Sequence, residues 1–101
     1  MNKIVYALKM SYGNNIPENY EEVILSAYTD RKKALDRYEF FEELASKLYE
    51  LRFSSKEKIE YNKISEILKL EIHIECGLLI NTRDLNIVFE FDLIENIRLY
   101  E

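Results

Sequence analysis

The spacing of apolar residues changes along the chain, and each change predicts a new element. Residues 3–12 alternate between apolar and polar side chains, and residues 21–29 are rich in β-branched and aromatic ones. Both patterns are typical of β-strands. The turn formers at 13–19 lie between them, so the two strands are expected to pair as a hairpin with a long loop.

Residues 29–55 switch to apolar positions three and four residues apart, which predicts an amphipathic helix. Thr29 or Asp30 can cap its first N–H groups. Phe40, Leu44 and Leu51 form a second apolar set beside the main stripe. Because this face is wider than contact with one sheet requires, it is either well buried or open to a partner, including a second copy of the chain.

The C-terminal half is less regular. Residues 56–69 fit either a short second helix, which we favour, or a connection with one turn. The stretch "KLEIHIEC" (69–76) alternates strictly and predicts a third strand, with Cys76 as a buried core thiol. Residues 77–84 form a turn that begins with a glycine, and residues 85–94 predict a fourth strand. Residues 95–101 extend that strand or add a fifth.

This order of elements predicts an α+β fold in a single domain, residues 1–101. An antiparallel four-stranded sheet is expected to carry one long amphipathic helix on one face and water on the other.

The composition bears on the cellular compartment of the protein and on membrane contact. A single cysteine, Cys76, excludes an intramolecular disulfide and fits a reducing compartment. Lys9 interrupts the apolar N-terminal stretch too early for a secretory signal or a membrane span. We therefore expect a cytoplasmic protein with no membrane contact.

The net charge of −5 is unevenly distributed: −2 over residues 1–30, +2 over 31–58 and −5 over 59–101. Direct binding of nucleic acid needs a basic surface to meet phosphates, so this balance argues against it. An acidic protein is better suited to a basic protein surface, although mild acidity also simply keeps a small protein soluble.

The candidate chemistry lies in the acidic half. If residues 69–76 and 85–94 pair as neighbouring strands, their polar side chains come together on one face of the sheet. The polar residues in question are Glu71, His73, Glu75, Glu90 and Asp92. Such a face could be merely solvated, could dock a basic partner, or could bind a metal or share acid–base work. No HExxH motif or paired histidine supports the last reading, and a flat sheet face lacks the pocket that it needs. No cofactor is expected.

A second candidate is the loop between the first two strands. Tyr12 and Tyr20 flank it, and Asn14 and Asn15 lie within it. Tyrosine is enriched at protein interfaces because it combines a large apolar ring with one polar group. Asn14, Asn15 and Tyr20 are therefore expected to contribute to partner binding.

The stretch "VYALKMSY…EEVILSAYTDRKKALDRYEFF" resembles a layout found in small proteins of phages and mobile elements, in which a capped helix follows a hairpin. Small acidic anti-CRISPR and other anti-defence proteins are similar in size, in charge and in having no catalytic motif. The resemblance implies stoichiometric binding to a larger host enzyme, often over its nucleic-acid channel. Fourteen basic residues disfavour mimicry of a whole duplex, so a local acidic patch or an allosteric clamp fits better.

The sequence thus predicts a non-enzymatic protein that inhibits or modulates a larger, basic protein or nucleoprotein complex by occupying its surface. Two alternatives come from other classes. One is a small metal-dependent or hydrolytic enzyme that uses His73 and neighbouring carboxylates. The other is a structural homo-oligomer, such as a homodimer joined through the surplus helix face.

Overall fold

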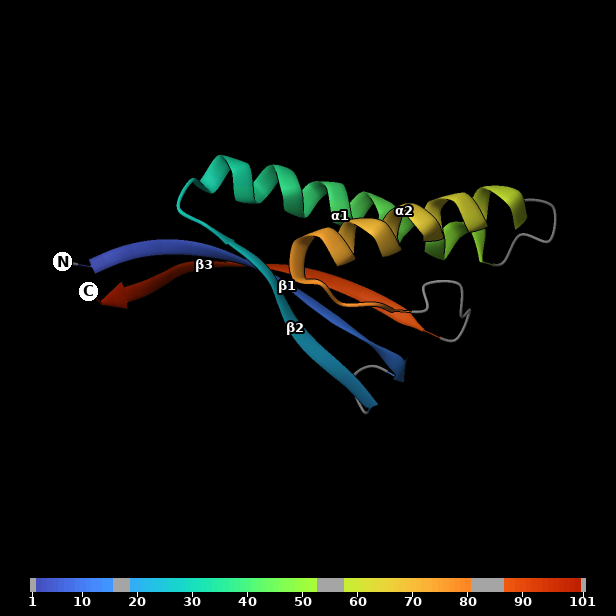
Figure 1. Cartoon of the computed structure of the whole chain (residues 1–101), viewed down its shortest axis with the longest axis horizontal. Coiled ribbons are helices and arrows are strands. Elements are labelled where there is room, and N and C mark those ends of the chain that lie inside the picture. The colour runs from blue at the N-terminus through green and yellow to red at the C-terminus, as the bar shows by residue number, and fades with distance from the viewer. Residues whose placement is uncertain (1, 16–18, 53–57, 81–86, 101) are drawn as a thin grey trace.

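The computed structural model describes residues 2–15, 19–52, 58–80 and 87–100. The elements follow the order β1 (Asn2–Asn15), β2 (Asn19–Tyr28), α1 (Arg31–Leu51), α2 (Lys58–Cys76) and β3 (Val88–Tyr100). The three strands form an antiparallel sheet in the order β2-β1-β3, and both helices lie on one face of it (Figure 1). The other face of the sheet is uncovered by these elements.

The core lies between the two helices and the sheet. Its largest fully buried side chains come from β1, α1 and α2 and are Leu8, Met10, Phe41, Ser65, Leu68 and Ile72. The ring of Phe41 stacks on that of Phe91 from β3, with centroids 5.0 Å apart. Aromatic stacking of this kind adds about 0.5–1.5 kcal/mol to the burial of the rings, so it helps to hold α1 over β3.

Asp30 caps α1, as its position before the helix predicts. Its Oδ1 accepts hydrogen bonds from the backbone N–H groups of Lys32, at 2.9 Å, and Lys33, at 3.4 Å. These bonds satisfy donors that the first helical turn leaves without partners. The helix expected over residues 29–55 ends at Leu51, and residues 53–55 lie outside the part of the chain that the structure describes.

The expected four-stranded sheet with one long helix is wrong, because residues 69–76 form the second half of α2. The buried residues Ile64, Leu68 and Ile72 are four positions apart, which places them on one side of a helix. Leu70 and Ile74, which a strand would align with Ile72, are 58% and 63% exposed. The helix favoured for residues 56–69 is therefore longer than expected. Gly77 follows it with φ of +75°.

Three further predictions, on the surplus face of α1, the last strand and the loops, can be compared with the structure. The surplus face of α1 is not open, since Leu44 is buried and Phe40 and Leu51 pack against the core. The strand expected over residues 85–94 begins at Val88 and runs to Tyr100, so residues 95–100 extend it. β1 and β2 extend into the predicted 13–19 loop, and residues 16–18 of that loop lie outside the described part of the chain. Residues 81–84 of the predicted 77–84 turn also lie outside it.

None of the helices that the structure describes is long and apolar enough to cross a membrane.

Candidate functional site

The predicted acidic cluster is split between the two sides of the sheet. Glu71, His73 and Glu75 lie on α2, which packs over one face. Glu90 and Asp92 are exposed on β3 and alternate with Phe91, which is buried beneath α1. Because successive side chains of a strand point to opposite faces, these two carboxylates project from the face that the helices leave uncovered. The five residues therefore do not form one site.

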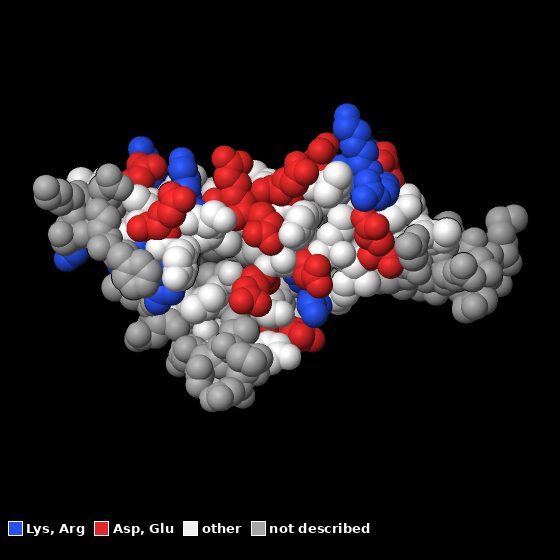
Figure 2. Space-filling view, turned by 180° about the vertical axis from the view of Figure 1, so that it is seen from behind, with Lys and Arg blue, Asp and Glu red and all other residues white. Residues whose placement is uncertain are grey.

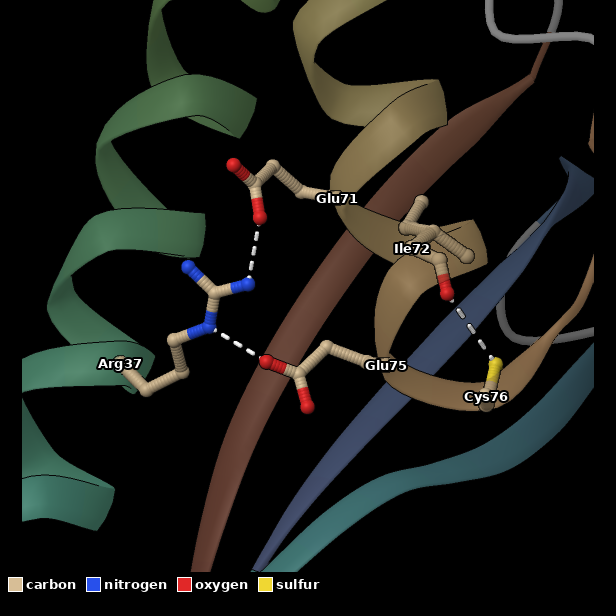
Figure 3. Close-up of polar contacts among 5 residues, drawn as sticks. All are labelled: Arg37, Glu71, Ile72, Glu75 and Cys76. Atoms are coloured by element: carbon tan, nitrogen blue, oxygen red, sulfur yellow. Dashed lines mark hydrogen bonds and ion pairs between the residues drawn. The ribbon is translucent and has the colours of Figure 1, made fainter.

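Glu71 and Glu75 bind Arg37 of α1 instead (Figure 3). The guanidinium donates from Nη2 to Oε2 of Glu71 and from Nε to Oε1 of Glu75, each at 2.6 Å. Its carbon also lies 4.8 Å from the ring centroid of Phe41, a cation–π distance. Both carboxylates thus join α1 to α2 rather than facing a partner.

The electrostatics of Arg37 agree with this structural role. Partial burial alone would lower the pKa of the guanidinium, since burial disfavours the charged form. Hydrogen bonds to Glu71 and Glu75, together with their charges, outweigh that effect and raise the pKa above its ordinary value. The cation is therefore held firmly between the helices.

His73 is exposed on α2 and lines a shallow hollow beside Leu70 and Leu79. Within the described ranges, no three His, Cys, Asp or Glu side chains lie close enough together to hold a metal ion. Cys76 is exposed and its thiol donates to the carbonyl oxygen of Ile72 at 3.5 Å, so the predicted core thiol is wrong. Cys76 lies four residues after Ile72, on the same side of α2, but it is the last residue of the helix and is exposed there.

Tyr20, Glu90 and Asp92 do share a surface. They line a hollow on the uncovered face of the sheet, together with Lys9 and Glu22. Lys9 pairs with Glu22 at 3.3 Å and lies opposite Asp92 in the β1–β3 register. Asn14 and Asn15 end β1, and their side chains lie outside what the structure describes.

A second hollow runs between α1 and β3. Glu42, Glu50 and Glu90 line it, with the rings of Tyr49 and Phe89. Glu90 lines both hollows, so they adjoin at this residue. We call the hollow between α1 and β3 the acidic groove.

Exposed carboxylates on α1 continue the acidic groove into a broader surface, and Figure 2 shows acidic side chains gathered in a band on this side of the molecule. We define the acidic face as the exposed carboxylates of α1 and β3 other than Glu95, which pairs with Arg31: Asp36, Glu39, Glu43, Glu50, Glu90 and Asp92. Sequence reasoning missed the α1 members, because residues 31–58 carry a net charge of +2. The spacing of 36, 39 and 43, three and four residues apart, was the signal that places them on one side of the helix.

The cavity beside the groove does not suit a substrate. It is lined by Leu48, Tyr61 and Val88, among others, and has a volume of about 40 Å³. That is room for a water molecule or two, whereas small-molecule sites occupy roughly 300–1,000 Å³. The hollow lined by Tyr20 and the acidic groove are larger, about 300 Å³ and 580 Å³, and both are more open to solvent than this cavity.

The chain matches no protein-family model, and no curated protein or solved structure is significantly similar to it.

Proposed function

We propose that this is a non-enzymatic, cytoplasmic protein-binding module that uses its acidic face to occupy a basic surface of a larger protein or nucleoprotein complex. The observation that carries the proposal is the set of six exposed carboxylates on α1 and β3, of which Glu50 and Glu90 line the acidic groove. Binding would inhibit or modulate the partner, as in the anti-CRISPR-like proteins that the first half of the sequence resembles.

The arrangement suits a basic protein surface better than it suits a small ion. Clustered carboxylates raise the rate of encounter with a positive partner and select against acidic ones. The groove adds Tyr49 and Phe89 beside the carboxylates. Aromatic rings supply contact area that can also accept arginine or lysine side chains.

The test is an affinity capture of the tagged protein from the lysate of its own cells, washed at low and at high salt, with identification by mass spectrometry. We expect one large basic partner that is recovered at low salt and reduced at high salt, since salt screens exposed charges. The double variant Glu43→Lys, Glu90→Lys should lose that partner.

The matched control is Glu21→Lys, Glu60→Lys, which changes the net charge equally but on β2 and α2, away from the acidic face. This control should retain the partner. Equal capture by both double variants, or equal loss in both, would contradict the assignment of the acidic face.

A further inference from the structure

α2 carries an apolar stripe on the side opposite the core. Ile59, Ile67, Leu70 and Ile74 follow one another at intervals of eight, three and four residues, which brings all four to one side of a helix. Their exposed fractions run from 83% for Ile59 to 40% for Ile67. Leu79, 71% exposed just after the helix, lies beside Leu70 in the same hollow. These five residues are the α2 stripe.

The stripe is distinct from the apolar side that packs α2 into the fold. Ile64, Leu68 and Ile72 are buried on that opposite side. A surface helix normally has one apolar side and one polar side, and a helix apolar on both sides is normally buried on both. Exposed apolar residues gathered on one side of a helix mark an interaction site, and within this series Lys63 is the interruption, between Ile59 and Ile67.

We infer that a second copy of this chain covers the α2 stripe, with the two α2 helices packed antiparallel about a two-fold axis between Glu66 and Ile67. This axis places Ile59 of each copy against Ile74 of the other, and Ile67 against its own counterpart. Lys63 of one copy lies along Leu70 of the other. Its four-carbon stem can cover that side chain while the ammonium group stays in water.

Charge complementarity favours this occupant and this direction. On the flank of the stripe, Glu66 of one copy lies near Lys69 of the other, and the two-fold axis repeats the pair. A parallel arrangement in register would instead bring Lys63, which lies between Ile59 and Ile67 on the same side of α2, against its own counterpart, and like charges repel. Two-fold interfaces of this kind are self-complementary.

The distribution of charge over the molecule supports the same arrangement. Three lysines and two glutamates occupy the first twelve positions of α2: Lys58, Glu60, Lys63, Glu66 and Lys69. This surface is therefore nearly neutral in a protein of net charge −5. Contact through α2 keeps the acidic faces of the two copies, which lie over α1 and β3, out of the interface. The inference does not depend on the proposed function.

The experiment measures the mass of the full chain by sedimentation equilibrium over a wide range of concentration. We expect a dimer of twice 12.2 kDa that dissociates on dilution. Ile59→Lys and Ile74→Glu should each raise the dissociation constant by at least roughly tenfold, because each places an unpaired charge in an apolar contact. The control Ile24→Lys changes an isoleucine that is 53% exposed on β2 and should leave the dimer intact.

A mixture of the two single variants tests the direction of packing. In an antiparallel pair, the ammonium group introduced by Ile59→Lys in one copy meets the carboxylate introduced by Ile74→Glu in the other. Mixing should therefore restore the dimer as a heterodimer. Single variants that dissociate and stay monomeric on mixing would overturn the antiparallel register.

Two further outcomes would overturn the inference itself. One is a wild-type protein that is monomeric at every concentration, and the other is a dimer that survives Ile59→Lys. Circular dichroism of each variant establishes that it remains folded.

Discussion

Nε of Arg37 on α1 donates to Oε1 of Glu75 on α2 across 2.6 Å, and the same guanidinium holds Glu71 at an equal distance. The three side chains are only 15–25% exposed. This contact joins residues 38 positions apart in the chain and fixes one helix against the other.

Arg37→Gln should destabilise the fold markedly. The substitution leaves two carboxylates, partly shielded from water, without their common cation. We expect the free energy of unfolding in urea to fall by about 2–3 kcal/mol, somewhat less than for a fully buried pair. The matched control is Arg31→Gln, whose pair with Glu95 at 2.8 Å is more exposed and should contribute at most about 1 kcal/mol. Similar small losses in both variants would show that the Arg37 contact is not structural.

Ile72→Ala and Ile74→Ala separate the helix from the strand that the sequence pattern suggests. Ile72 is fully buried, so its truncation should cost about 2–5 kcal/mol. Ile74 is exposed, and its truncation should change the free energy of unfolding by about 0.5 kcal/mol or less. Urea unfolding at low protein concentration keeps any association out of this comparison. Equal losses would indicate that both side chains share one buried side, as in a strand.

The strand prediction for residues 69–76 failed for a physical reason. α2 is apolar on two sides, so Leu70, Ile72 and Ile74 alternate with polar residues even though the helix sends them in different directions. Eight residues are too few to separate a period of two from one of 3.6. The longer stretch from Lys58 to Cys76 contains no glycine or proline, and Gly77 follows it directly. That length was the better signal, because strands are usually three to ten residues long.

The structure brings some of the predicted site residues together and separates others. Glu90, Asp92 and Tyr20 share the uncovered face of the sheet, on the two strands that flank β1. Glu71 and Glu75 were assigned to a partner because nothing local in the sequence reveals that Arg37, more than thirty residues earlier, binds both. The carboxylates of α1 were missed because a net charge over a segment averages the two sides of a helix.

Gly77→Ala should cost about 1–2 kcal/mol in the free energy of unfolding. The residue has φ of +75° immediately after α2, and its N–H donates to the carbonyl oxygen of His73 at 2.8 Å. An added Cβ would meet no atom within 4 Å, so the cost comes from the left-handed backbone rather than from a clash. Gly77→Asn is the control, since asparagine tolerates this conformation and should cost less. An alanine variant as stable as the wild type would mean that α2 can end in another way.

The hydroxyl of Tyr38 should make stability depend on pH in the alkaline range. It donates to Oε1 of Glu42 at 2.9 Å, and this bond, partial burial and the charges of Glu42 and Asp92 raise the pKa of Tyr38 above its ordinary value of 10.0. A raised pKa means that the fold favours the protonated hydroxyl. The stabilisation is therefore complete below the pKa of tyrosine in the unfolded chain, and it is lost as pH rises through the higher pKa of the folded state.

We expect Tyr38→Phe to lower the free energy of unfolding by about 1 kcal/mol below pH 10, and the difference from the wild type to shrink above that pH. Urea unfolding of both proteins across this range measures that difference. Glu42→Gln removes the nearest charge and should move the loss to lower pH, and a difference that is constant with pH would contradict the role of this bond.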